Sequence, residues 1–215
     1  MAGNRRKLSN PLALAVLVLL SERPMHPYEI AQTLRQRGKE HSVKINFGSL
    51  YTVVQNLEKH GYVEVAEVQR QGNRPERTLY GLTDDGRVEM VDWMSDLLAV
   101  PAVEFPLFGT AVSLMPVLPP DDVAVHLEDR LAKLEVQAAG IRGVLHALHE
   151  KLPQLFLVET EYQLHMIEAE MEWVRGFRKD LVDGTVGGQA EWESWHRTGE
   201  TPKKWKDLEE QNPRD

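Results

Sequence analysis

The stretch that decides the fold, residues 46–61, reads NFGSLYTVVQNLEKHG. Four of its apolar side chains recur at the spacing of one helix face: Leu50, Val53, Val54 and Leu57. Asn46 is a typical N-cap residue, and Gly61 follows the last apolar position, where glycine commonly ends a helix. The stretch therefore predicts an amphipathic helix with one apolar face and one polar face.

The segments on either side of this helix predict the rest of a small domain. The expected elements are helices over 11–21 and 27–37, strands over 62–69 and 77–83 around a polar turn, and a helix from Thr83 or Asp84 to about Leu98. Taken in chain order they read helix, helix, helix, strand, strand, helix. That order is the plan of a winged helix-turn-helix domain with a two-stranded wing.

The second half of the chain predicts long helices. Apolar residues there step alternately by three and four positions: Ala124, Leu127, Leu131, Leu134, Ala138, Ile141, Leu145, Leu148 and Leu152. Such a heptad seam needs a partner helix. Both a second helix over 155–182 and a second copy of the chain qualify, and we expect helix 121–152 to contact both. The expected dimer interface consists of Leu127, Leu131, Leu134, Ile141, Leu145 and Leu148.

These patterns predict a mainly α fold in which an N-terminal winged helix-turn-helix is followed by a long-helix dimerisation region. The expected parts are a DNA-binding domain over 1–98, a packed, proline-rich connector over 99–120, a helical dimerisation domain over 121–196 and a polar, flexible tail over 197–215.

Charge is divided unevenly along the chain. The whole sequence has 25 basic and 33 acidic residues, a net charge of −8, which on its own disfavours nucleic acid as a partner. Residues 1–80, however, contain 12 lysines and arginines against 7 aspartates and glutamates, whereas residues 91–215 contain 12 against 23. A basic first domain joined to an acidic second one is typical of proteins that bind nucleic acid through the first.

In a helix-turn-helix the second helix of the unit enters the major groove, and its outward side chains contact base edges. Here that helix begins near Asn46. The candidate DNA-binding residues are Lys44, Ser49, Tyr51, Thr52, Gln55 and Asn56 around this helix and Arg70, Asn73, Arg74 and Arg77 in the hairpin. A solvated helix face with no ligand is the alternative interpretation of the polar residues.

Several short motifs are familiar in combination. Residues 26–30 read HPYEI, residues 48–51 GSLY, residues 57–63 LEKHGYV and residues 80–87 YGLTDDGR. Together they resemble the PadR family of bacterial transcriptional regulators over about residues 8–90, and more loosely over the helical second half.

The resemblance implies a homodimer that binds a palindromic operator in double-stranded DNA, mostly as a repressor, and that releases DNA on binding a small aromatic or drug-like effector. It also implies DNA contacts by Ser49, Tyr51 and Thr52 and by Arg74 and Arg77 of the wing. Thr52 stands where many members have proline, and Glu76 interrupts the basic wing. The operator sequence therefore does not transfer.

Other functions find little support. The absence of cysteine excludes disulfides, thiolate metal sites and a cysteine nucleophile. His146 and His149 lack a third ligand at a fixed spacing. We therefore expect no catalytic residue, no metal and no cofactor. The apolar run 12–20 is too short to span a bilayer and is not followed by a cleavage site, so we expect a cytoplasmic protein that does not contact membranes. A winged-helix scaffold that binds proteins is the alternative to a DNA-binding regulator.

Overall fold

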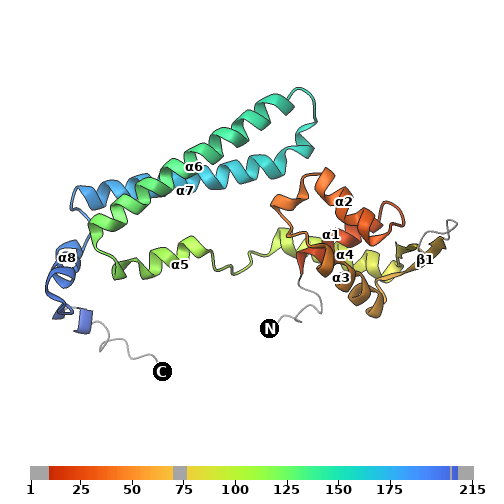
Figure 1. Cartoon of the computed structure of the whole chain (residues 1–215), viewed down its shortest axis with the longest axis horizontal. Helices are drawn as coiled ribbons and strands as arrows, with labels where there is room; N and C mark the ends of the chain where they lie inside the picture. The colour runs from red at the N-terminus through yellow and green to blue at the C-terminus, as the bar shows by residue number, and fades with distance from the viewer. Residues whose placement is uncertain (1–9, 70–76, 204, 208–215) are drawn as a thin grey trace. The chain divides into compact units, whose positions relative to one another are not determined.

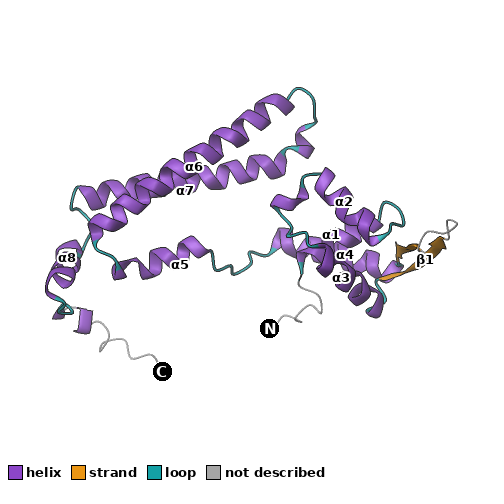
Figure 2. Cartoon of the chain, in the orientation of Figure 1, coloured by secondary structure: helices purple, strands orange, loops and turns teal. Residues whose placement is uncertain are grey.

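The computed structural model describes residues 10–69, 77–203 and 205–207. The chain forms two compact units, residues 1–104 and 105–215, each with a hydrophobic core of its own. Both units are mainly helical, and the strands of the described residues lie in unit 1 (Figures 1 and 2). The expected mainly α fold with a two-stranded wing is confirmed.

Helix α1 (Pro11–Leu20) forms the centre of unit 1. Seven of its ten residues are buried, which explains why its sequence is apolar on every side. The side chain of Asn10 accepts a hydrogen bond from the Leu12 amide at 3.0 Å and so caps the helix. Packed around α1 are α2 (Pro27–Gln36), α3 (Phe47–Lys59), α4 (Asp84–Ala99) and strand β2 (Arg77–Leu82).

Helix α3 is the helix that the opening stretch predicts. The Asn46 side chain accepts from the Gly48 amide at 3.0 Å, and Leu50 and Leu57 are fully buried in the core of unit 1. Gly61 follows the helix with a φ of +77°, in the left-handed region that favours glycine. A short 3-10 helix, η1 (Lys39–His41), joins α2 to α3.

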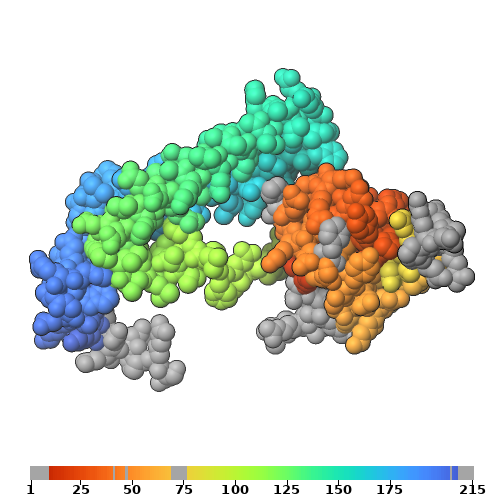
Figure 3. All heavy atoms as spheres, in the orientation of Figure 1, coloured from red at the N-terminus to blue at the C-terminus, as the bar shows by residue number. Residues whose placement is uncertain are grey.

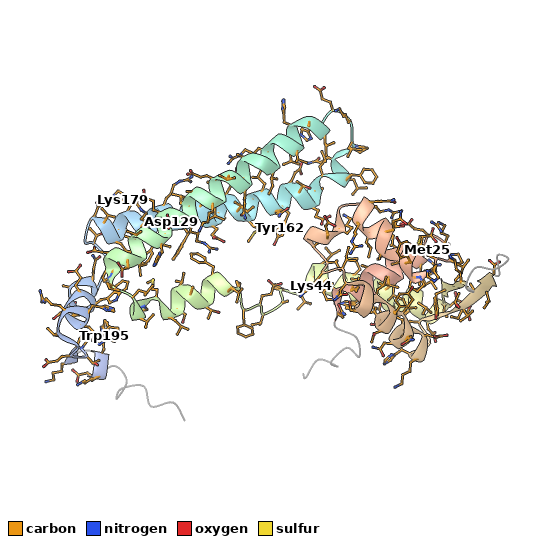
Figure 4. The ribbon with its side chains drawn as sticks, in the orientation of Figure 1. Met25, Lys44, Asp129, Tyr162, Lys179 and Trp195 are labelled. Atoms are coloured by element: carbon orange, nitrogen blue, oxygen red, sulfur yellow. The ribbon has the colours of Figure 1, made fainter. Side chains whose placement is uncertain are left out.

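Strands β1 (Val63–Gln69) and β2 form the antiparallel hairpin, with Val63 opposite Leu82 and Gln69 opposite Arg77. A bulge between Val65 and Glu67 shifts the register, which the approximate alternation of the sequence did not predict. Met25 pairs with Tyr80 through two backbone hydrogen bonds of 3.0 Å, so a third extended segment joins the hairpin beside α2. Met25 is labelled in Figure 4.

The start of α4 ties the hairpin to the end of α3. The Thr83 hydroxyl accepts a hydrogen bond from the Gly86 amide at 3.0 Å and donates one to the Gly61 carbonyl at 2.7 Å. Gly86 lies so close to the Tyr62 backbone that an added Cβ would be 2.0 Å from the Tyr62 carbonyl oxygen. The backbone approach thus requires glycine at this position.

Unit 2 is built on a pair of long antiparallel helices, α6 (Pro120–Leu148) and α7 (Val158–Val182), which pack along each other (Figure 3). The heptad seam of α6 faces α7: Leu134 and Ala138 are buried with Met171, and Leu127 is buried with Val174. The expected contact between the two helices of one chain is confirmed. Four ion pairs connect them: Arg130–Glu170, Arg142–Glu168, Arg175–Glu135 and Arg178–Glu128.

The remaining elements of unit 2 cover the ends of this pair. They are α5 (Leu107–Leu114) and the 3-10 turn η2 (Met115–Val117) before α6, the 3-10 turn η3 (Gln154–Phe156) between the long helices, and α8 (Gln189–Thr198). The indole N–H of Trp192 donates to the carbonyls of Pro116 and Leu118 at 3.1 and 2.9 Å, which fastens α8 to the segment before α6.

Two expected helix boundaries are wrong. The first long helix ends at Leu148 and not at 152, so Leu152 lies outside it with 39% of its surface exposed. Pro153 contributes to this, because in a helix its ring would clash with the carbonyl of His149 and it disfavours helical geometry at Leu152. The second long helix begins at Val158, after η3, and not at 155. In the described residues no helix is both long and apolar enough to cross a membrane.

Candidate nucleic-acid interface

The outward face of α3 is polar and exposed. Tyr51 is 45% exposed, and Thr52, Gln55 and Asn56 are exposed as well, whereas the opposite face is buried. Ser49 is half-buried, and its hydroxyl donates to the Asn46 carbonyl at 2.9 Å, so it also stabilises the start of the helix. The face therefore presents hydroxyl, phenol and carboxamide groups, which can donate to and accept from base edges.

Two of the candidate cations lie on described segments. Lys44 is exposed in the loop before α3 (Figure 4), and Arg77 is exposed at the first position of β2. Neither forms an ion pair with another described residue. The other candidates of the hairpin tip, Arg70, Asn73 and Arg74, lie outside the described residues.

A cleft of about 690 Å³ lies between α2, α3 and β2. The residues that line it are His26, Tyr28, Glu29, Gln32, Tyr51, Arg77 and Leu79. Of these, Tyr51 and Arg77 were predicted from the sequence as DNA contacts. Tyr28 and Gln32 could have been found as a polar pair four residues apart on one face of α2, but nothing in the sequence placed that face beside β2.

His26 has a defined tautomer in this cleft. Its Nδ1 accepts a hydrogen bond from the Tyr28 amide at 3.1 Å and caps α2. Burial, and secondly the positive charge of Arg77, hold the pKa of His26 below its ordinary value, so the ring is neutral at pH 7. A neutral ring that accepts at Nδ1 carries its proton on Nε2. The ring meets that of Tyr51 edge-on, with centroids 6.2 Å apart.

Ion pairs neutralise the carboxylates around α2. Glu29 accepts from Arg23 at 2.5 Å, and Glu22 accepts from Arg37 at 2.5 and 2.7 Å. Hydrogen bonds from the paired arginines hold the pKa values of both carboxyl groups below their ordinary values. Glu29, the acidic residue that lines the cleft, is therefore charge-compensated.

Unit 2 contains a groove of a different character. About 540 Å³ in volume, it lies between α5, η2, α6 and α7 and is lined mainly by apolar and aromatic side chains. The rings of Phe108, Trp173 and Phe177 form consecutive contacts, with centroids 5.9 and 5.2 Å apart. The Arg130 guanidinium lies 3.6 Å from the Phe108 ring centroid and pairs with Glu170. This volume and lining suit a small organic ligand.

The described residues contain no group of three histidine, aspartate or glutamate side chains arranged to hold a metal ion. In particular, neither His146 with His149 nor Glu161 with His165 is completed by a third ligand there. The polar side chains that lie together in unit 1 are those of the outward face of α3 and of the cleft, which Tyr51 of α3 and Arg77 of β2 both line.

Known proteins show the same architecture. Residues 16–92 match the model of the transcriptional regulator PadR-like family. No curated protein matches the chain. Among solved structures, Bacillus subtilis PadR in complex with operator DNA is similar at 18% identity, covering 80% of this chain and 99% of that chain, with a TM-score of 0.64.

Two further structures are similar to the chain at comparable levels. Bacillus subtilis PadR in complex with p-coumaric acid has 17% identity, 79% and 98% coverage and a TM-score of 0.63. The Vibrio cholerae virulence activator AphA has 16% identity, 80% and 98% coverage and a TM-score of 0.59. At these identities the likeness establishes the fold over both units.

Proposed function

We propose that the chain is a homodimeric repressor of the PadR-like family of transcriptional regulators, whose model matches residues 16–92, and that it binds a palindromic operator. The family is one of regulators, so no enzymatic activity is assigned to the chain. One observation carries the proposal: α3 has a fully polar outward face flanked by the exposed cations Lys44 and Arg77.

The polar face of α3 supplies two kinds of DNA contact. Thr52, Gln55 and Asn56 carry the donors and acceptors that distinguish base pairs in the major groove. Lys44 and Arg77 can neutralise phosphates, together with Arg70 and Arg74 of the wing. We propose that the first group sets the sequence preference, while the cations set overall affinity and its salt dependence.

Selection from a pool of random duplexes by the purified full-length protein tests this proposal. A regulator of this kind enriches one palindromic sequence, because a two-fold symmetric dimer binds two inverted half-sites. A protein-binding scaffold enriches none. The Arg74→Ala/Arg77→Ala double variant should then bind the selected duplex more weakly and with a shallower salt dependence. Unchanged affinity and slope would show that the wing is not a DNA contact.

The exposed apolar surface of unit 2 supports a homodimer. Tyr162 of α7 is 65% exposed (Figure 4), and Met166, one turn further along that helix, is 50% exposed. Phe105 before α5 and Leu107 in it are more than 80% exposed. An apolar surface of this kind usually marks an interface. Within the heptad seam, Leu127 and Leu134 are already buried against α7, so further contacts fall to its partly exposed members, Leu131, Ile141, Leu145 and Leu148.

Light scattering coupled to size-exclusion chromatography tests the dimer. The wild type should have twice the chain mass, and Tyr162→Glu/Met166→Glu should shift it toward the monomer, since the charges would be buried unpaired. Val136→Glu, at a position 74% exposed on α6, is the matched control for an added charge. A monomeric wild type would refute the proposed assembly.

We also propose that a small planar aromatic effector binds in the groove of unit 2 and releases DNA. PadR of Bacillus subtilis, a structural relative, has been solved with p-coumaric acid, and the groove offers three aromatic rings with Arg130 and Lys133 at its polar side. The test is release of the selected duplex by a panel of aromatic acids. Ala111→Trp, which fills the groove, should abolish release, and Ser113→Trp, which does not line it, should retain it.

A further inference from the structure

The cleft between α2, α3 and β2 carries an inference that rests on the proposed DNA binding. Its walls come from three elements, and most of its lining residues can donate hydrogen bonds. These donors are His26, Tyr28, Gln32, Tyr51 and Arg77, of which Arg77 is positively charged. The acidic residue of the lining is paired with an arginine outside it, as described above.

Charge makes this cleft a site for an anion. The Arg77 guanidinium forms no ion pair with any other described residue, yet it lies close enough to the His26 ring to depress its basicity. A cation beside several neutral donors and an already compensated carboxylate favours a ligand with negatively charged oxygens. A neutral or cationic ligand would give the Arg77 guanidinium no opposite charge.

The position of the cleft, between the outward face of α3 and the wing, indicates which anion it binds. Tyr51 belongs both to the cleft and to the outward face of α3, and Arg77 begins the second strand of the wing. The cleft is therefore continuous with the proposed base-contacting surface and ends where the wing begins. In a helix-turn-helix the helix that precedes the recognition helix crosses the DNA backbone, which is the place of α2 here.

We propose that this cleft binds a backbone phosphate of double-stranded DNA, and that His26, Tyr28 and Gln32 donate hydrogen bonds to it beside Arg77. The Nδ1 of His26 is occupied by the Tyr28 amide, so Nε2–H is the donor that the ring offers. Tyr28 and Gln32 lie one turn apart on the same face of α2. These contacts position the protein on DNA without distinguishing sequences.

Two substitutions of the same chemistry separate this proposal from a general effect on α2. Gln32→Ala removes a side chain of the cleft, whereas Gln36→Ala removes an exposed amide one turn further along the helix, outside it. Tyr28→Phe removes only the phenol hydroxyl. Fluorescence anisotropy titrations of the full-length variants use the selected duplex and a scrambled duplex of equal length over a series of salt concentrations, after thermal unfolding has shown that each variant is folded.

Gln32→Ala and Tyr28→Phe are each expected to weaken binding by about 10-fold or more, because a hydrogen bond to a charged group such as a phosphate contributes more than one between neutral groups. The loss should be equal on the two duplexes, and the salt slope should be unchanged because no charge is removed. Arg77→Ala should reduce that slope by about 1. Gln36→Ala should bind as the wild type does.

Wild-type affinity in both cleft variants would overturn the proposal, and so would a loss confined to the selected duplex, which would mean that these residues contact bases. The proposed regulatory function fails by a different result. If the wild type enriches no palindrome but the cleft variants still weaken binding to the scrambled duplex, the cleft assignment stands and sequence-specific regulation does not.

Discussion

Gly86→Ala is expected to destabilise unit 1 strongly, although alanine is the better helix former. The added Cβ would lie 2.0 Å from the Tyr62 carbonyl oxygen and 2.8 Å from Leu82 Cδ1. The oxygen is backbone, held between the end of α3 and β1, so it cannot turn away as a side chain can. The chain must move apart there by about 1.5 Å to restore an ordinary contact of about 3.5 Å.

The magnitude follows from two opposing effects. Overpacking of a well-packed site costs about 1–3 kcal/mol and sometimes more, and here the obstacle is rigid. Replacing a helical glycine by alanine returns about 1 kcal/mol. Because the required displacement is large, we take the overpacking cost as about 3–4 kcal/mol, at and above the upper end of that range. We therefore expect a net loss of about 2–3 kcal/mol in the free energy of unfolding of unit 1, or roughly 10 °C or more in its melting temperature.

Hydrogen exchange of the full-length protein measures this change in each unit separately, because slow amides report local and global opening. Peptides from α1, α3 and α4 should lose protection, and those from α6 and α7 should not. Gly140→Ala is the matched control: its Cβ would meet nothing within 4 Å on exposed α6, so unit 2 should become more stable by about 0.5–1 kcal/mol. Unchanged protection of unit 1 in Gly86→Ala would refute the close approach as the reason for this glycine.

Three further predictions concern the same two units. Thr83→Ala removes the cap of α4 and the hydrogen bond to the Gly61 carbonyl, so it should lower the free energy of unfolding of unit 1, measured by chemical denaturation, by about 1–2 kcal/mol. A decrease smaller than the measurement error would contradict the capping role. Since the folded-state pKa of His26 lies below its ordinary 6.5, the folded unit binds protons less readily than the unfolded chain, and its stability should fall as the pH drops through 6.5 toward the lower folded value. His26→Asn keeps a capping side chain and should lose this part of the pH dependence. Parallel pH profiles of stability for the two proteins would contradict this role of His26. In unit 2, Leu134→Ala should cost about 2–5 kcal/mol because the side chain is buried between α6 and α7, and a cost below 1 kcal/mol would show that the seam is not packed as described.

The sequence predicted the elements of unit 1 well because each has a local cause. Asn10, Asn46 and Thr83 each cap the helix that follows, and Asn46 was expected to do so. The inward set of α3 follows directly from its 3.6-residue period. The bulge near Ala66 and the pairing of Met25 with Tyr80 depend on contacts between distant segments, so no local pattern indicated them.

The candidate site divides in the same way. The exposed residues of α3 could be named from periodicity, because committing one face to the core leaves the other for ligands. The cleft could not, since it needs His26 of the α2 cap beside Arg77 of β2, positions that only the folded unit brings together. In unit 2 the seam was evident and was expected to contact both helix 155–182 and a second copy, but the sequence left open which contact is the main one. Four arginine–glutamate pairs now match α6 to α7 within the chain.

The central claim is that the polar face of α3 determines which DNA sequence the protein binds. Repeating the selection from random duplexes with the Thr52→Ala/Gln55→Ala variant tests it most directly. Both side chains are exposed and make no contribution to the core, so the variant should fold normally. The variant should lose its preference at symmetric positions of both half-sites of the selected palindrome, because each base contact contributes about 1–3 kcal/mol of discrimination. Enrichment of the wild-type palindrome with undiminished preference at every position would contradict it.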